Sequence, residues 1–333
     1  MKDGVFVSVV LPAYNRANSI HRAMSSVLGQ THPDLELIVV DDASTDETCE
    51  VVSSIRDKRV RLIRHSRNRG ASAARNTGIA AAKHTLVAFQ DSDDSWRPDK
   101  LERQVDAFRE APPHIGVVFS QMATHKANGD TVVTPTHLPS RSLELDTRGL
   151  LWANFVGTPT AVVQRRVLDL VGGFDEELRA LEDWELWIRV SQRFGLLMIA
   201  EPLVDVPPSP NSISRSEEEE VAARACVITK HESLYFEVQG GRCLLSRQQR
   251  KVGLTHFHLG KAAPGRYFLH AAMRNCPSMI NVSLFLLSLF GRRLFSLAAP
   301  LILRLDRLIR SAMRRLRVLL ASRSSLASVS TQE

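Results

Sequence analysis

Three carboxylates are crowded into four positions directly after a short apolar run. The stretch reads VAFQDSDDSW over Val87–Trp96, and it contains Asp91, Asp93 and Asp94. Like charges this close repel one another, so either a nearby positive charge balances them or water solvates them. Carboxylates spaced this way at a strand end can share Mg²⁺ or Mn²⁺, which take one or two protein carboxylates beside water and substrate phosphates. The alternative is a simple polar turn, and the triplet alone does not exclude it.

Two other polar turns, PAYN and DDAST, also follow apolar runs. The pattern predicts buried strands at 5–11, 35–40, 59–64 and 85–89, with helices at 17–28, 45–55 and 71–83. Strands that alternate with helices of this length predict βαβ units and a parallel sheet. Ligands of such sheets bind beyond the carboxyl ends of the strands. Since all three polar turns fall at that edge, we expect them to form one site.

The second half of the chain gives weaker signals. We expect strands at 115–120 and 158–164, helices from Arg165 and over 182–194, and a break at PPSPNS. Ser216 and Glu219 have the spacing of a capping box, which predicts a helix start there. The EEEE run beside them is interpreted as the solvated first turn of that helix.

Charge and cysteines limit the class of protein. Residues 291–333 hold nine arginines against Asp306 and Glu333, a net charge of +7, so residues 1–290 carry none of the formal charge of +7. The four cysteines include no CxxC pair, which argues against a disulfide framework or a zinc ribbon and suits a reducing compartment. The amino-terminal stretch lacks the pattern of a signal peptide and is interpreted as a first strand.

The basic tail is amphipathic. Its apolar segment MINVSLFLLSLF has twelve residues, whereas a spanning helix needs about 20. Beyond it, apolar residues recur at steps of three and four with arginines on the opposite side: Leu301, Leu305, Leu308, Ile309, Ala312, Leu316 and Leu319 against Arg307, Arg310, Arg314 and Arg317. The pattern predicts a helix that lies on an anionic membrane surface or packs on the body. Nucleic acid is not expected as a partner, because no aromatic residues are interleaved.

Six sequence blocks follow one another in the order and spacing of glycosyltransferase family 2, which the chain resembles over residues 5–214. They read VSVVLPAYNRANSIHRAMSSVLGQT, LELIVVDDASTDET, NRGASAARNTGI, VAFQDSDDSWRPDKL, GGFDEEL and EDWELWIR. Six ordered blocks are far more specific than one acidic triplet. The resemblance implies the GT-A fold, a Rossmann-like, mostly parallel α/β sheet flanked by helices, here with a C-terminal helical extension. It also implies transfer of a sugar from a nucleotide diphosphate donor with inversion at the anomeric carbon.

The resemblance implies a donor site at the three turns. Tyr14 would stack on the nucleotide base beside Pro12, and Asp42 would accept a hydrogen bond from the base edge. Arg75 would approach the base or the diphosphate, and Asp91 would reach the ribose. The plainer alternatives are a core aromatic for Tyr14, a turn residue for Asp42 and a helix-surface arginine for Arg75.

The resemblance also implies a metal and a base. Asp93, with Asp94, would hold Mn²⁺ or Mg²⁺. Asp183 matches the general base, and Glu182 beside it is the competing candidate. An inverting transfer is one displacement, so one carboxylate near the acceptor hydroxyl suffices to take its proton. The alternative for both residues is an acidic first turn of a helix.

One element of the family pattern is missing. Many relatives carry Tyr-Arg and then His after the base helix, whereas here Val206, Pro207 and Ser209 occupy these places. The change puts donor binding in question or shifts the role to another residue such as Arg215. The chain also lacks the QxxRW element of the processive synthases, so a single transfer is expected.

The sequence therefore predicts a metal-dependent inverting glycosyltransferase that moves one sugar from a UDP- or dTDP-sugar to a glycan or lipid-linked acceptor. We expect a transferase domain at 1–214, with a donor half (1–110) and an acceptor half (111–214), then a helical extension (215–275) and the basic tail (276–333). The expected location is cytoplasmic, peripheral on the inner face of the membrane. The rivals are a non-catalytic sugar-binding module and a nucleotidyltransferase, which would need a glycine-rich loop that PAYNRANS lacks.

Overall fold

The computed structural model describes residues 4–138, 143–208 and 216–308. By its internal contacts the chain divides into two compact units, residues 1–223 and 224–333. The first unit holds the sheet and the three polar turns, and the second is helical.

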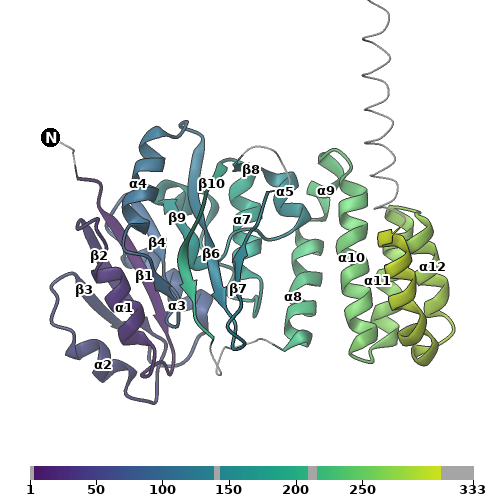
Figure 1. Ribbon diagram of the computed structural model, residues 1–333, viewed down its shortest axis with the longest axis horizontal. Coiled ribbons are helices and arrows are strands. Elements are labelled where there is room, and N and C mark those ends of the chain that lie inside the picture. The colour runs from purple at the N-terminus through teal and green to yellow at the C-terminus, as the bar shows by residue number, and fades with distance from the viewer. Residues whose placement is uncertain (1–3, 139–142, 209–215, 309–333) are drawn as a thin grey trace, which may run out of the picture. The chain divides into compact units, whose positions relative to one another are not determined.

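The first unit is built on one sheet of ten strands within its described residues, in the order β3-β2-β1-β4-β9-β6-β10-β5, with β7 on β6 and β8 on β10 (Figure 1). The strands are β1 (Val7–Ala13), β2 (Leu35–Asp41), β3 (Val60–Arg64), β4 (Leu86–Phe89), β5 (Ser95–Trp96), β6 (Ile115–His125), β7 (Thr131–Thr134), β8 (Glu144–Leu145), β9 (Ala161–Gln164) and β10 (Gly195–Val206). The helices are α1 (Ile20–Leu28), α2 (Thr48–Ser54), α3 (Ala71–Ala81), α4 (Lys100–Glu110), α5 (Thr147–Trp152), α6 (Arg165–Val171) and α7 (Glu182–Ser191), with a 3₁₀ turn, η1 (Thr158–Thr160).

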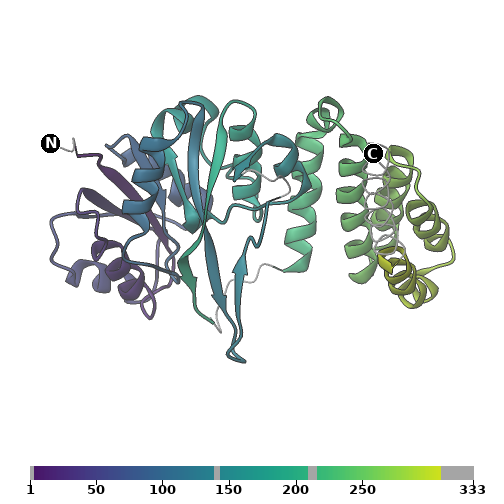
Figure 2. The ribbon, with the colours of Figure 1, turned by 45° about the horizontal axis from the view of Figure 1, so that its top comes forward.

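The predicted α/β class is confirmed, and its parallel part lies where the sequence places it. The strand β1 pairs in parallel with β2 and β4, and β2 pairs in parallel with β3. The second half mixes directions, because β9 runs antiparallel to both β4 and β6. Figure 2 shows the β6–β7 hairpin extending beyond the other strands of the sheet.

Alternate residues of the central strands face opposite sides of the sheet, as the period of two requires. On one side Val7, Val9 and Leu11 of β1 pack into a core with apolar residues of α1, α2 and α4. On the other side α3 lies so close to β1 that a Cβ on Gly78 would be 2.3 Å from a methyl of Val10. Close packing of α3 fixes the position of Arg75, which the same helix carries.

The longest strand, β10, was not predicted. It spans twelve residues and pairs in parallel with β6, with register shifts around Ile199 and Pro202. Proline and bulges interrupt the alternation by which a strand is recognised, so its residues gave no clear signal. The predicted start of the next helix is confirmed: α8 covers Glu217–Lys230, and the backbone N–H of Glu219 donates to Ser216 Oγ at 3.1 Å.

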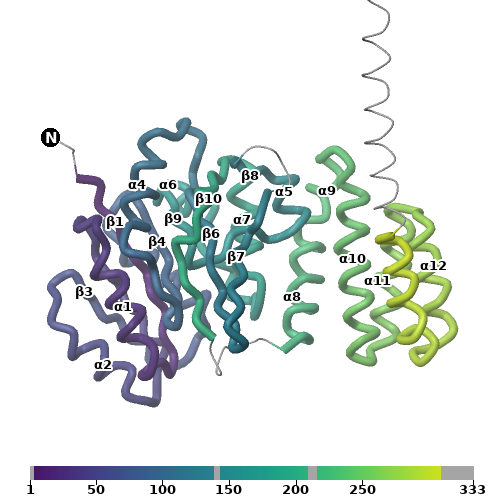
Figure 3. Tube along the Cα trace, in the orientation of Figure 1, coloured from purple at the N-terminus to yellow at the C-terminus, as the bar shows by residue number. Residues whose placement is uncertain are grey.

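After α8 the second unit consists of helices joined by short connections, which can be followed in Figure 3. The helices are α9 (Glu232–Glu237), α10 (Gly241–His258), α11 (Ala262–Asn275), α12 (Met279–Ser288) and a helical segment at 292–308. Phe257, Leu269, Leu284 and Phe295 form its apolar core. None of the helices in the described ranges is long and apolar enough to cross a membrane.

The cysteine spacing argued against a disulfide framework, and it did not indicate that two of the four cysteines pair. Cys243 and Cys276 form a disulfide. The helices α10 and α11 form a hairpin, so residues near the start of the first and just after the end of the second lie side by side. A separation of 33 residues hides this proximity in the sequence.

Candidate active site

The three polar turns lie together at the carboxyl edge of β1, β2 and β4, as expected from the parallel pairing. Pro12 is buried within β1 opposite Val40, and Tyr14 beyond it is 39% exposed. Two residues of the turns, Asn15 (φ 52°) and Ala43 (φ 63°), have left-handed backbone conformations that are unusual for side chains other than glycine. Such strain persists only where the surroundings enforce it, and it gathers at functional sites.

Hydrogen bonds join the first two turns. The N–H of Asn15 donates to Ser44 Oγ at 2.9 Å, and Asn15 Oδ1 accepts the N–H of Thr45 at 2.8 Å. The N–H of Arg16 donates to Thr48 Oγ1 at 2.7 Å. Sequence reasoning did not single out these residues, although they hold Tyr14 and Asp42 in a fixed relation.

Asp42 is buried and its carboxylate is already occupied. Its Oδ1 lies 2.7 Å from His65 Nδ1, and Oδ2 accepts the N–H of Gly70 at 2.7 Å. The N–H of Arg69 donates to both oxygens, at 2.9 and 3.1 Å. Asp42 therefore anchors the loop before α3, and a nucleotide base would have to share one of these oxygens.

Arg75 supplies the positive charge that the acidic cluster requires. It is buried on α3, and its guanidinium donates to Asp91 at 2.8 Å and to Glu182 at 2.9 Å. Burial alone would lower the pKa of Arg75, but the carboxylates of Asp91 and Glu182 outweigh it and raise that pKa. The third nitrogen, Nε, is buried with no hydrogen-bond partner in the described part of the chain. One cation thus links the DSDD turn to the start of α7.

The other two carboxylates of the cluster are less well balanced. The nearest guanidinium nitrogen of Arg16 is 3.9 Å from Asp93, and Arg22 donates to the backbone carbonyl of that residue at 2.6 Å. Burial, followed by the charge of Asp91, raises the pKa of Asp93. Burial and the charges of Asp91 and Asp93 raise the pKa of Asp94 to about 8. Ionisation of both carboxyl groups is therefore unfavourable unless a further cation is present.

The cluster is not a preformed metal cage. Among the residues with described placement, no group of three His, Cys, Asp or Glu side chains could hold an ion. Mg²⁺ needs only one or two protein carboxylates when substrate phosphates complete its shell. Asp93 and Asp94 fit that second arrangement, in which the ion arrives with a diphosphate.

The structure separates the two base candidates. Glu182 is 3% exposed and its carboxylate faces Arg75, whereas Asp183 is partly exposed. Asn154 Nδ2 donates to Asp183 Oδ2 at 3.0 Å, and the N–H of Trp184 donates to Oδ1 at 2.7 Å. Burial and the neighbouring Glu182 raise the pKa of Asp183 to about 6. Asn154, which the sequence motifs did not indicate, fixes the orientation of this carboxylate.

The place of the missing Tyr-Arg-His element lies beside the acidic turn. Val206 ends β10, and Asp205 before it is the register partner of Ser95 in β5. The carboxylate of Asp205 lies 3.0 Å from His125 Nε2 and 3.4 Å from Arg97 Nε. A histidine and an arginine from other strands and turns therefore approach this edge. Ser209 and Arg215 lie outside the described residues.

The sheet, with the polar turns at its carboxyl edge, has the GT-A fold. The fold is similar to that of TarS from S. aureus, residues 1–349, in complex with UDP-GlcNAc (TM-score 0.67, 19% identity), over 91% of this chain and 92% of that one. It is also similar to the mannosyltransferase PcManGT from Pyrobaculum calidifontis in complex with GDP-Man and Mn²⁺ (TM-score 0.51, 20% identity), over 88% of this chain and 86% of that one.

The chain belongs to glycosyl transferase family 2. The model of this family matches residues 8–170. The chain is 30% identical over 233 residues to the putative teichuronic acid biosynthesis glycosyltransferase TuaG of Bacillus subtilis. The matched region covers 69% of this chain and 90% of TuaG. It spans only 66%, 33% and 30% of the length of three other curated relatives that it matches.

Removing Arg75 should destabilise the first unit strongly. An Arg75→Ala variant removes the guanidinium that pairs with the buried Glu182, and removing one partner of a buried ion pair typically costs about 3–5 kcal/mol of unfolding free energy. Arg69→Ala is the matched control, because Arg69 pairs with Glu176 on the surface and such pairs contribute at most about 1 kcal/mol. Urea unfolding of both variants measures the difference, and equal losses would contradict the bridging role of Arg75.

Proposed function

We propose that this protein is a metal-dependent inverting glycosyltransferase of cell-surface polysaccharide synthesis. It moves one sugar from a UDP- or dTDP-sugar to a glycan or lipid-linked acceptor. The observation that carries the proposal is the division of roles between two acidic groups. Asp93 and Asp94 of the DSDD turn are less well balanced by cations than Asp91, while Asp183 is held separately by Asn154. Arg75 pairs with both Asp91 and Glu182 and so joins the two groups.

The donor lies at the carboxyl edge of β1, β2 and β4. Tyr14, 39% exposed, stacks on the base, with Pro12 behind it. Asp42 shapes the base pocket through the loop that it anchors and shares Oδ2 with the base edge. Asp91 reaches the ribose while it is paired with Arg75. A nucleotide-sugar donor agrees with the complexes of the structurally similar TarS and PcManGT.

Asp93 and Asp94 hold Mn²⁺ or Mg²⁺ against the donor diphosphate. When bound, the ion neutralises charge on the leaving diphosphate. Burial, and after it the charges of neighbouring carboxylates, raise the pKa values of Asp93 and Asp94, and a bound cation would offset both effects. Cation and nucleotide therefore assist one another in binding.

Asp183 takes the proton of the acceptor hydroxyl as that oxygen attacks the anomeric carbon. The attack comes from the face opposite the diphosphate, so a single base on the acceptor side suffices. Asn154 and the N–H of Trp184 each donate to one carboxylate oxygen of Asp183, and they leave its remaining lone pairs for the acceptor. Burial gives the carboxylate a pKa of about 6, close to the pH at which it must work.

The second candidate is a sugar-binding module without turnover. The observation in its favour is Val206 and Pro207 in place of the missing polar element. Such a module would bind nucleotide and acceptor but transfer no sugar.

The transfer rate should depend on Asp183 and on its ionisation. We expect Asp183→Asn to lower the rate about 10²–10⁴-fold while nucleotide binding persists. In the native enzyme the rate should fall as the pH drops through about 6, because the base becomes protonated.

Asn154→Ala removes a hydrogen bond to the charged form of Asp183, so the acid limb of the pH profile should move to higher pH. Full activity of Asp183→Asn with loss of activity in Glu182→Gln would assign the base to Glu182 instead.

The second unit places the enzyme at an anionic membrane surface, on the cytoplasmic side where lipid-linked acceptors lie. In the segment 292–308, Phe295 and Ala299 are buried, whereas a second apolar stripe faces outward. The stripe consists of Leu294, Leu297, Leu301, Leu305 and Leu308, each between 47% and 74% exposed. Arg293, Arg304 and Arg307 belong to the same segment and match anionic headgroups in charge. Ile309 and the predicted tail residues beyond it lie outside the described residues.

Co-sedimentation with vesicles tests the stripe. We expect the native chain to bind vesicles that contain phosphatidylglycerol far better than vesicles of phosphatidylcholine alone, and less well at high salt. Replacing Leu297, Leu301 and Leu305 by serine should weaken binding about tenfold or more, since three exposed side chains lose their burial in lipid. Unchanged binding of this variant, or of a chain that ends at residue 291, would contradict the proposal.

A further inference from the structure

The two units of the chain carry opposite net charges. Residues 1–223 hold 25 Lys and Arg against 32 Asp and Glu, a net charge of −7, whereas residues 224–333 hold 18 against four, a net charge of +14. Between Glu237 and Asp306 the chain contains ten Lys and Arg and no Asp or Glu. The helices α10, α11 and α12 therefore offer their cations no carboxylate partner of their own. A surface with this excess of positive charge attracts polyanions.

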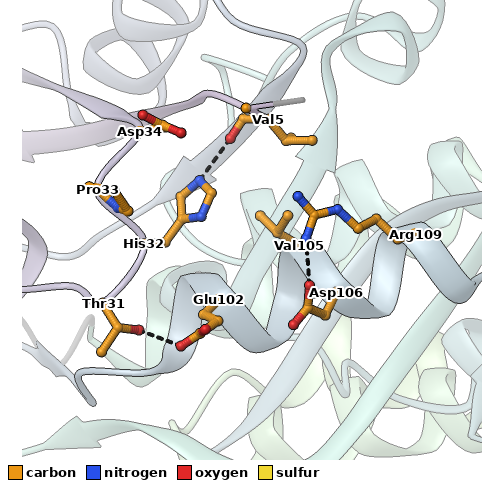
Figure 4. Close-up of a pocket in the computed structure, with 10 residues that line it drawn as sticks. Val5, Thr31, His32, Pro33, Asp34, Glu102, Val105, Asp106 and Arg109 are labelled. Carbon is orange, nitrogen blue, oxygen red and sulfur yellow. Dashed lines mark hydrogen bonds and ion pairs between the residues drawn. The ribbon is translucent and has the colours of Figure 1, made fainter. Parts of the chain in front are cut away.

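A hollow on the first unit shows the opposite character. It has a volume of about 190 Å³, lies before the amino end of β1 and is lined by Asp34, Glu102 and Asp106 (Figure 4). The guanidinium of Arg109, which also lines it, is already paired with Asp106 at 2.6 Å, as a dashed line in Figure 4 shows. A hollow with this lining repels an anionic polymer, which we therefore expect to bind to the second unit.

The outward face of α11 combines cations with an aromatic ring. At 3.6 residues per turn, Arg266, His270 and Arg274 follow one another along one side of the helix, and Tyr267 falls in the same sector. Arg266 is half-buried and His270 and Arg274 are exposed, while Tyr267 is 69% exposed. The buried side of the helix lies opposite and consists of Gly265, Leu269 and Ala272.

Neighbouring rings support the aromatic residues of this face. The ring of Phe268 meets that of Tyr267 edge to face, with centroids 5.2 Å apart, and stacks on His256 of α10 at 6.0 Å. The ring of His270 lies 5.0 Å from that of Phe285 on α12. Tyr267 thus presents a supported ring to water. The flat apolar body of such a ring can pack on the C–H groups of a sugar, while its hydroxyl stays in water.

This face differs from the apolar stripe of the segment 292–308. That stripe consists of leucines, as a helix that lies in a lipid interface requires. Among the residues of α11, all of which are described, only Tyr267 is a large apolar side chain with high exposure, and cations flank it. A polymer in water, with rings for stacking and anionic groups for the guanidinium groups, matches this face better than a lipid surface does.

From this arrangement we propose that the outward face of α11, defined by Arg266, Tyr267, His270 and Arg274, binds an acidic polysaccharide. Tyr267 stacks on a sugar ring, and the two arginines, about 12 Å apart along the helix axis, pair with carboxylate or phosphate groups of the chain. The choice of a glycan among polyanions rests on the proposed function, in which this polymer is the acceptor. By holding the polymer, the face raises the local concentration of acceptor ends.

Calorimetric titration of the full chain with an oligogalacturonate, in the absence of nucleotide, tests the proposal. We expect saturable binding that weakens as the salt concentration rises. Two matched probes should bind at least about tenfold more weakly. The methyl ester of the same oligomer keeps the sugar rings without the charge, and oligoglutamate keeps the charge without the rings. Equal binding of either probe, or no binding of the oligogalacturonate, overturns the proposal.

Variants of α11 locate the polymer. Arg266→Gln with Arg274→Gln should weaken oligogalacturonate binding about tenfold or more, because two charge-assisted pairs are lost. Tyr267→Ala should abolish the preference for oligogalacturonate over oligoglutamate. Lys230→Gln removes a cation of α8 in the same unit and is the control, with unchanged affinity expected.

Two results would assign the face differently and overturn the proposal. Loss of binding in Arg304→Gln with Arg307→Gln, together with native affinity in the α11 variants, would place the polymer on the segment 292–308. Loss of vesicle binding in the α11 double variant, with native affinity for the oligomer, would make the face part of the membrane surface. Failure of the proposed function would instead appear as a lack of nucleotide binding, which this titration does not involve.

Discussion

The buried guanidinium of Arg75, held between Asp91 and Glu182, is the interaction on which the site depends. A cation in this place allows three carboxylates to follow β4 without forcing the turn open. Its two partners are 91 residues apart in sequence, so the same group also sets the distance between the DSDD turn and α7. The position of Arg75 depends in turn on α3, which approaches β1 through Gly78. Packing of one helix on the sheet thus decides where the acidic groups lie.

The pairing of Arg75 gives the acidic residues different tasks. The buried carboxylate of Glu182 is paired with Arg75, whereas the adjacent carboxylate of Asp183 at the start of α7 is partly exposed. Asp91 is likewise paired, and the unbalanced charge falls on Asp93 and Asp94. The proposed base and the proposed cation site therefore differ in their surroundings because Arg75 pairs with the carboxylate beside each of them.

Much of this arrangement could be predicted from the sequence, and the reasons for the exceptions are physical. Apolar runs ending in PAYN, DDAST and DSDD predicted three turns on one edge, because parallel strands bring their carboxyl ends together. The Arg75–Glu182 pair and the Asn154–Asp183 bond join distant segments, so no local pattern reveals them. The strand β10 was missed because Pro202 and its bulges break the alternation. The Cys243–Cys276 bond was missed because it follows from the hairpin of α10 and α11.

The most direct measurement of the central claim is the thermal stability of the purified protein with UDP, GDP and dTDP, each with and without Mn²⁺. Binding to the native state alone raises stability, by about 2.7 kcal/mol at a ligand concentration of 100 Kd. We expect a Mn²⁺-dependent increase with UDP or dTDP that is lost in Asp93→Asn and kept in Asp130→Asn, a variant of the exposed β6–β7 turn. No increase with any nucleotide, or an equal increase in Asp93→Asn, would contradict the account of a cation and a diphosphate that share the acidic turn.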